Sequence, residues 1–332
     1  MNASPNLSAR SSRRPDEAEV IGYLETLSNW GRWGTDDRRG TLNLITPEIR
    51  RAAAALVTSG DTVSCACEIT TTTPTDAHAT RHMLKTGEGL SDPWRARDAE
   101  VIPGVATSMH MDFALERLGL DYHGADTTHV DALSHYFWNG TLYNGHPAES
   151  VSAQYGARVL DIRGASAGIV TRGVLLDMPA VLGVDWLPAD YGVTIADLEA
   201  AERRQGVTVR AGDVVLLRTG HRHRSRAGVE RITNETEAGW QAGVLPWLRE
   251  RDVAMIGSDG SNDVLPSGYI DIPVPVHTVA LTAMGLWMLD NADLEALAER
   301  CAAESRWEFL FVLAPLAFEG ATGGPVNPLA VF

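Results

Sequence analysis

Apolar runs and alternating stretches predict the strands of this chain. Three runs are apolar through their centres, at residues 172–178, 213–218 and 253–256. Continuous runs of this kind are typical of strands that are buried on both faces of a sheet. Residues 307–313 predict a further apolar strand, and residues 61–69 alternate between apolar and polar side chains like a strand with one exposed face.

Capping residues predict three helices between these strands. Before each helix stands a threonine or an aspartate that can accept a hydrogen bond from the first helical turn. Pro47 also suits a first helical position, because an N–H at that position has no partner within the helix. The helices with their capping residues are 49–57 with Thr46, a helix to about residue 205 with Thr194 and Asp197, and a helix through about residue 304 with Asp293.

Strands and helices mix along the chain without strict βαβ repetition, and neither an internal repeat nor a long linker divides it. We therefore predict an α/β fold in which residues 16–332 form a single domain. Residues 1–15 are rich in Ser, Arg and Asn, which predicts a disordered tail. Residues 70–104 are polar and irregular, and long loops of this kind often cover an active site.

Composition narrows the expected partners and location. The 332 residues include 28 basic and 43 acidic side chains, a formal net charge of -15. Such an acidic surface repels phosphate backbones, so we expect no nucleic-acid partner. Because no apolar run approaches the roughly 20 residues of a membrane helix and the N-terminus lacks the apolar core of a secretory signal, we expect no membrane partner and a cytoplasmic location. The three cysteines are expected to be free thiols: Cys65, Cys67 and Cys301.

The densest set of chemical groups lies in residues 123–135, which hold three histidines. His129 and Asp131 are two residues apart, so on an extended segment both side chains point to one face. Imidazole nitrogen and carboxylate oxygen are ordinary ligands for zinc or manganese, and one carboxylate can bridge two ions. His135 can act as a free acid or base beside a metal, and the Thr128 hydroxyl can orient a ligand or a water. Structural hydrogen bonding is the alternative for each histidine alone, but the cluster favours a metal site.

These residues also resemble a family signature. Thr128-His129-x-Asp131-x-x-x-His135 is similar to the core of His-x-Gly-Thr-His-x-Asp-x-x-x-His. That signature belongs to the cyclase family, which includes bacterial kynurenine formamidase, isatin hydrolase and trans-dienelactone hydrolase. Further similar segments, typical of its longer members, cover nearly the whole chain at residues 33–37, 40–43, 172–177, 212–213, 218–220, 257–259, 275–277 and 323–328.

The resemblance implies a swivelling β/β/α fold for the catalytic domain and a divalent metal, Zn2+ or Mn2+, near a hydrolysed carbonyl. His129 and Asp131 fall on metal-ligand positions, and His135 falls on the position of the proton carrier. His277 matches a distal histidine ligand, and Asp290 stands where the family has a glutamate ligand. We therefore predict that His277 and Asp290 share one cavity with His129.

One position departs from the signature. Ala125 stands where the first histidine belongs, and its side chain cannot bind metal. His123 lies two residues earlier and is predicted to be either a substitute ligand or a substrate contact. Because losing a ligand weakens a metal site, we predict metal occupancy that is weaker than usual or confined to one ion.

The resulting functional prediction is a metal-dependent hydrolase of a small amide, lactone or ester. A metal-bound water would be the nucleophile, and His135 would shuttle the proton to the leaving group. One alternative is a cyclase, dehydratase or isomerase with weak or no metal dependence, and another is a small-molecule binding protein without catalysis. The expected partners are a small-molecule substrate and further copies of the chain, as a dimer or tetramer.

Overall fold

A computed structural model of the chain describes residues 13–71, 79–86, 113–124, 126–229 and 235–332. Contacts divide the chain into two compact units, one of Met1–Cys67 with His123–Phe332 and the other of Glu68–Tyr122. Residues 1–12 of the expected disordered tail lie outside the described residues. Compactness does not measure independent folding, so a single catalytic domain over residues 16–332 stays a prediction.

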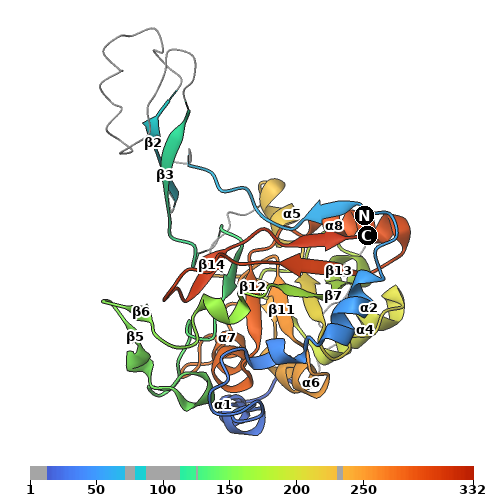
Figure 1. The fold of residues 1–332 in the computed structure, drawn as a ribbon. Coiled ribbons are helices and arrows are strands. Elements are labelled where there is room, and N and C mark those ends of the chain that lie inside the picture. The colour runs from blue at the N-terminus through green and yellow to red at the C-terminus, as the bar shows by residue number, and fades with distance from the viewer. Residues whose placement is uncertain (1–12, 72–78, 87–112, 125, 230–234) are drawn as a thin grey trace, which may run out of the picture. The chain divides into compact units, whose positions relative to one another are not determined.

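Among the described residues of the larger unit, nine strands form one mixed sheet (Figure 1). The four strands from β7 to β12 are parallel to their neighbours in that stretch, and the other pairs are antiparallel. In order across the sheet they are β1 (Thr62–Ser64), β15 (Leu329–Val331), β13 (Glu308–Leu313), β7 (Ile169–Asp177), β9 (Val214–Arg218), β11 (Met255–Ser258), β12 (Trp287–Asp290), β4 (His129–Asp131) and β14 (Gly323–Pro325).

The four apolar runs of the sequence form β7, β9, β11 and β13, with bounds shifted by up to three residues. All residues of β11, and all of β9 except its last, are buried, as expected for strands that are covered on both faces. Together with the helices that pack on the sheet, this confirms the predicted α/β class. Shorter strand pairs are β8 (Gly192–Val193) with β10 (Gly239–Trp240), and β5 (Val151–Ser152) with β6 (Gly156–Ala157).

The helices begin largely where the capping residues predict. Thr46 accepts a hydrogen bond from the N–H of Ile49, and Thr194 with Asp197 forms a complete capping box. Asp293 is a correction: Leu294 occupies the N-cap position, although Asp293 Oδ1 still accepts from the N–H of Glu295 at 3.3 Å. The described helices are α1 (Glu17–Thr26), α2 (Pro47–Ala54), α3 (Met178–Leu182), α4 (Ile195–Gln205), α5 (His221–Arg226), α6 (Leu245–Glu250), α7 (Pro275–Val279) and α8 (Glu295–Glu304), with a π-helical turn at Ala280–Met284 and 3-10 turns at Gly40–Leu44, Tyr143–Gly145, Ala148–Ser150, Ile162–Ala165 and Ala242–Val244.

The strand expected over residues 61–69 is much shorter. Only β1 pairs with β15, and beyond it the backbone N–H of Cys65 donates to the carbonyl of Pro328. The N–H of Cys67 then donates to the Thr128 hydroxyl, so side-chain and loop contacts replace the ladder. All three cysteines are free thiols, as predicted.

The smaller unit contains an antiparallel ribbon of β2 (Ala79–Lys85) and β3 (Leu115–Leu120). β2 corrects the expectation of an irregular loop over residues 70–104, of which 72–78 and 87–104 lie outside the described residues. Its described side chains are mostly exposed, so β2 carries no buried apolar stripe that would have predicted a strand.

The position of β4 matters most for the chemistry. It lies between β12 and β14 in the sheet, with His129 opposite Asp290 and Asp131 opposite Met288. Its three residues are all buried. Within the described ranges, every helix is too short or too polar to cross a membrane.

Candidate active site

Two neighbouring strands bring three potential ligands together. His129 and Asp131 project from the same face of β4, as alternation predicts, with His129 Nε2 3.6 Å from Asp131 Oδ1. Asp290 stands at the end of β12 opposite His129, and its Oδ2 lies 3.8 Å from the same nitrogen. His129 Nδ1 donates to the carbonyl of Thr127 at 2.8 Å, which leaves Nε2 as the nitrogen directed at the carboxylates.

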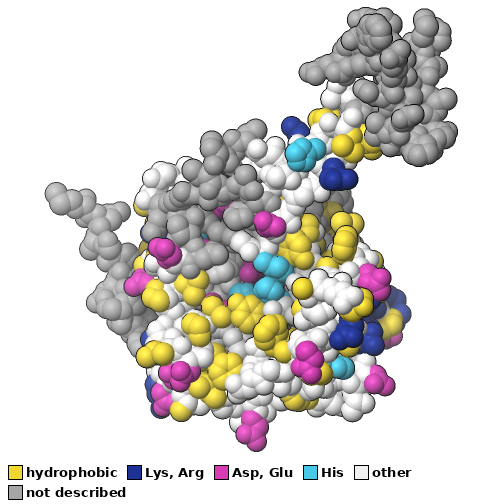
Figure 2. Space-filling model, turned by 90° about the vertical axis from the view of Figure 1, so that its left-hand side faces the viewer, with side chains coloured by type: hydrophobic (Ala, Val, Ile, Leu, Met, Phe, Trp, Pro, Cys, Tyr) yellow, Lys and Arg dark blue, Asp and Glu magenta, His cyan; other side chains and the backbone are white. Residues whose placement is uncertain are grey.

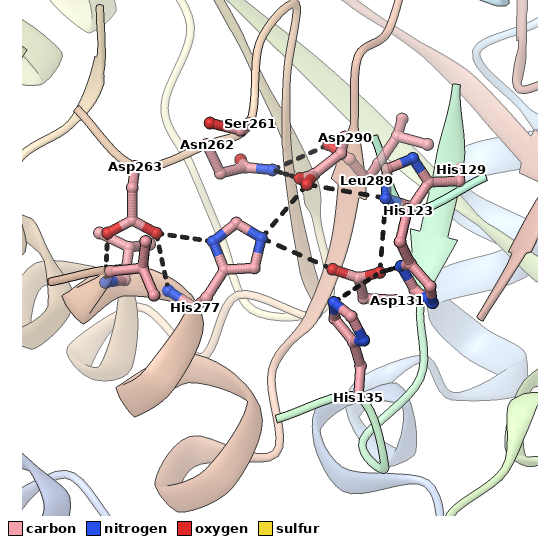
Figure 3. A network of polar contacts seen from close by, with 12 residues as sticks. His123, His129, Asp131, His135, Ser261, Asn262, Asp263, His277, Leu289 and Asp290 are labelled. Atoms are coloured by element: carbon pink, nitrogen blue, oxygen red, sulfur yellow. Dashed lines mark hydrogen bonds and ion pairs between the residues drawn. The ribbon is translucent and has the colours of Figure 1, made fainter. Parts of the chain in front are cut away.

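Helix α7 adds the fourth group (Figure 3). His277 Nε2 lies 3.2 Å from Asp290 Oδ2 and 3.5 Å from Asp131 Oδ2. His129, Asp290 and His277 line one cavity. The prediction that His277 and Asp290 share a cavity with His129 is therefore confirmed.

The remaining two histidines lie on the other side of Asp131. His123 Nδ1 is 3.1 Å and His135 Nε2 is 3.9 Å from Asp131 Oδ1. The two imidazole rings are stacked, with centroids 3.8 Å apart and planes within 2° of parallel. His123 is thus near the ligand cluster despite its offset in the signature, whereas Ala125 lies outside the described residues.

Thr128 points away from this cluster. Its hydroxyl donates to the carbonyl of Asn291 at 2.6 Å and accepts from the N–H of Cys67 at 2.8 Å. These contacts tie the start of β4 to the segments after β12 and β1. A direct role of Thr128 in orienting a ligand stays a prediction.

The histidines open into a cavity of about 590 Å³. Figure 2 shows histidine side chains at the centre of one face, bordered by hydrophobic side chains. One part of the lining comes from the segment after β11 and is called the loop wall: Ser261, Leu265, Pro266, Ser267, Gly268, Tyr269, Pro273 and Val274. The rest consists of the cluster histidines, Asp290, Gly124, Tyr136 and Glu235.

The cluster suits a divalent metal. Both carboxylate oxygens of Asp131 are buried and, among the described residues, face imidazole nitrogens at 3.1 to 3.9 Å in ion-pair contacts, without a well-formed hydrogen bond. A cation bound between them would offset the cost of burying this charge. Two sets of potential ligand atoms, each within 4.8 Å of one another, share this carboxylate. One set is His123, His129 and Asp131, and the other is Asp131, His277 and Asp290. The donors are imidazoles and carboxylates, which suit zinc or manganese.

The pKa shifts of Asp131 and His277 also indicate that carboxylates and imidazoles in the cluster stabilise one another's charges. Burial opposes charge on Asp131, yet the surrounding imidazoles, above all that of His135, hold the pKa of its carboxyl well below the usual range. Burial likewise opposes charge on His277, but the carboxylates of Asp290 and Asp131 raise the pKa of His277 well above its usual value. A metal at this position would therefore displace a proton from His277.

Two residues that support the cluster were not predicted from the sequence. Asp263 accepts from His277 Nδ1 at 2.6 Å and from the N–H groups of Val276 and His277 at the start of α7. Asn262 donates to Asp290 Oδ1 and to the carbonyl of Leu289. Both belong to the run 259–263 that follows the buried strand β11, and this position after an apolar strand was the available signal.

Replacing Asp263 with asparagine is expected to weaken metal binding by roughly 10- to 100-fold, because the carboxylate orients the His277 ring and increases its basicity. Asparagine keeps one oxygen for the start of α7. The matched control is Asp259→Asn in the same loop, whose carboxylate accepts from Thr219, Gly220 and His221 instead. Metal-competition titration measures the effect, and equal affinity of Asp263→Asn and the unaltered protein would contradict it.

Comparison with known proteins agrees with this fold. Residues 46–262 match the model of a family described as "Putative cyclase". The crystal structure of a novel cyclase is 32% identical, with a TM-score of 0.78 over 92% of this chain and 99% of that one. Isatin hydrolase A from Labrenzia aggregata, bound to benzyl benzoate, is 17% identical, with a TM-score of 0.56 over 84% of this chain and 94% of its own. A search of curated proteins found no significant match.

A second isatin hydrolase A, from Ralstonia solanacearum, is 19% identical, with a TM-score of 0.54 over 86% of this chain and 97% of its own. At such identities the isatin hydrolases support the fold alone. The family match includes His129, Asp131 and His135 and ends before His277 and Asp290. The expected fold type is thereby confirmed, whereas the roles of these residues stay predictions.

Proposed function

This chain belongs to the cyclase family, and on that premise we propose that it is a metal-dependent hydrolase of a small amide, lactone or ester. The observation that carries the proposal is Asp131, a buried carboxylate that faces imidazole nitrogens and is shared by two sets of potential ligands. A divalent ion bound there would polarise the substrate carbonyl and make an attacking water more acidic.

The chain's own residues supply the proton transfer. Burial lowers the pKa of His135 to about 4, although Asp131 acts in the opposite direction. The imidazole is therefore neutral near pH 7 and has a lone pair that can accept a proton, although a pKa this far below 7 makes it a weak base. His135 lines the cavity beside Asp131, so it can take a proton from water and return it to the leaving group.

Metal removal tests the proposal. The protein is treated with a chelator, dialysed, and assayed against small cyclic amides, lactones and esters with and without added Zn2+ or Mn2+. We expect turnover to be lost on chelation and restored by one of the two ions. Full turnover in metal-free protein would contradict the proposal and favour a cyclase, dehydratase or isomerase reaction that needs only His135.

A second prediction concerns His123. Its distance of 3.1 Å from Asp131 supports its assignment as the substitute for the histidine that Ala125 replaces. We expect His123→Ala and His129→Ala to lower metal content by similar amounts, because each removes one of the three ligands of the same set. Elemental analysis after dialysis measures this. If His123→Ala keeps its metal and changes only substrate affinity, His123 is a substrate contact instead.

A further inference from the structure

The three hydroxyl groups of the loop wall all donate their protons to acceptors within the protein. Ser261 donates its hydroxyl proton to Glu237 Oε2 at 2.7 Å. Ser267 donates to the carbonyl of Pro273 at 2.7 Å, and Tyr269 donates to the carbonyl of Pro15 at 2.8 Å. Each hydroxyl thus donates its proton to an acceptor of the protein, which leaves its oxygen lone pairs for accepting. The Ser267 oxygen already accepts from the N–H of Tyr269 at 3.4 Å.

The orientation of Ser261 is the most firmly set. The backbone N–H of Ser261 donates to the same Glu237 oxygen at 2.9 Å, so this oxygen acts as an acceptor toward both groups. Glu237 is fully buried, and its backbone exchanges two hydrogen bonds with Leu265, at 3.0 and 2.8 Å. Leu265 and Ser261 both line the cavity, so Glu237, which is not itself a lining residue, is tied to the loop wall through its bonds to both.

The charge of the lining agrees with a neutral substrate. Among the described residues, those that line the cavity include acidic side chains but neither lysine nor arginine. The lining residues themselves thus offer a carboxylate or phosphate no guanidinium or ammonium group. Arg14 contacts the loop wall, but its guanidinium already donates to the Ser267 carbonyl and lies over the Tyr269 ring. Ser261 directly precedes Asn262 in the chain, and Asn262 donates to the candidate ligand Asp290 (Figure 3).

We propose that Ser261, with its proton held by Glu237, accepts a hydrogen bond from an N–H group of the substrate and thereby selects neutral N–H amides and lactams. This inference rests on the proposed hydrolase function and narrows its substrate class. A lactone has a ring oxygen where the lactam has N–H, so the lactone oxygen and the Ser261 oxygen would face each other as two acceptors. An N-methyl lactam lacks the donor. In both cases the serine oxygen is desolvated without a partner.

The test uses three neutral probes of nearly the same shape: isoindolin-1-one with N–H, N-methylisoindolin-1-one, and the lactone phthalide. Calorimetric titration of each into metal-loaded protein measures binding without requiring turnover. We expect isoindolin-1-one to bind roughly 10-fold tighter than the other two, as one additional neutral hydrogen bond would produce. Ser261→Ala should remove this preference. Ser59→Ala should keep it, because Ser59 bonds the carbonyl of Phe332 and does not line the cavity.

Equal affinity of the unaltered protein for all three probes would overturn the proposal. So would a preference that survives in Ser261→Ala, or no binding of isoindolin-1-one at millimolar concentration. These outcomes differ from a failure of the hydrolase proposal. An N–H preference without turnover of any lactam would support the Ser261 assignment and contradict the hydrolase function, whereas turnover without the preference would do the reverse.

Discussion

His135→Ala is expected to lower turnover by roughly 100-fold or more, because general acid–base catalysis by a positioned side chain contributes at least that much. Metal content should stay unchanged, since neither potential ligand set includes His135. The half-buried, neutral imidazole lies 3.9 Å from Asp131 and lines the cavity, which places a proton acceptor beside a candidate metal ligand. Steady-state kinetics and elemental analysis of the same preparation measure the two quantities.

Two controls separate catalysis from folding. Added imidazole should restore part of the turnover of His135→Ala by entering the space that the side chain leaves. His223→Ala should behave like the unaltered protein, because His223 is half exposed and lies outside the lining of the cavity. Near-normal turnover of His135→Ala would remove His135 from the mechanism.

Asp131→Asn is expected to reduce metal affinity by more than about 100-fold, beyond the loss caused by changing a residue that only orients a ligand. Asp131 is common to both potential ligand sets, so its replacement affects every metal position that the cluster offers. Asparagine has nearly the same shape but one neutral oxygen in place of two charged ones. Elemental analysis after dialysis against a chelator measures the remaining metal.

The matched control is Asp161→Asn, whose carboxylate accepts from Arg163 and Gly320 instead of facing the cluster. Its metal content should be normal. Thermal unfolding followed by circular dichroism checks that Asp131→Asn is folded. A variant that is folded and still retains tightly bound metal would show that Asp131 is not the shared ligand.

The sequence predicted those features that depend only on residues close together in the chain. His129 and Asp131 were placed on one face because side chains alternate in any extended strand, whatever its neighbours. The capping box of Thr194 and Asp197 was equally predictable, since both partners lie within one helical turn. Buried strands were predicted from apolar runs, because a strand that is covered on both faces needs no polar side.

Contacts between residues that are far apart in the chain could not be predicted from local sequence patterns. His277 and Asp290 were linked to the site only through the family resemblance, because nothing in their spacing from His129 indicates proximity. Asp263 supports His277 through the start of a helix that the sequence did not predict. The pairing of β1 stops at Ser64, opposite Leu329, where β15 begins, and residues 61–69 alone carry no information about that partner.

The place of β4 in the sheet has a consequence for protein synthesis. β4 hydrogen-bonds to β12 and β14, and both strands lie far later in the chain. A growing chain thus exposes His129 and Asp131 long before the ribosome has released the segments that hold them in place. Until then these two side chains lack Asp290 and His277 as neighbours. The proposed metal would therefore find its full ligand set only late in the maturation of this protein, when β12 and helix α7 have packed around β4.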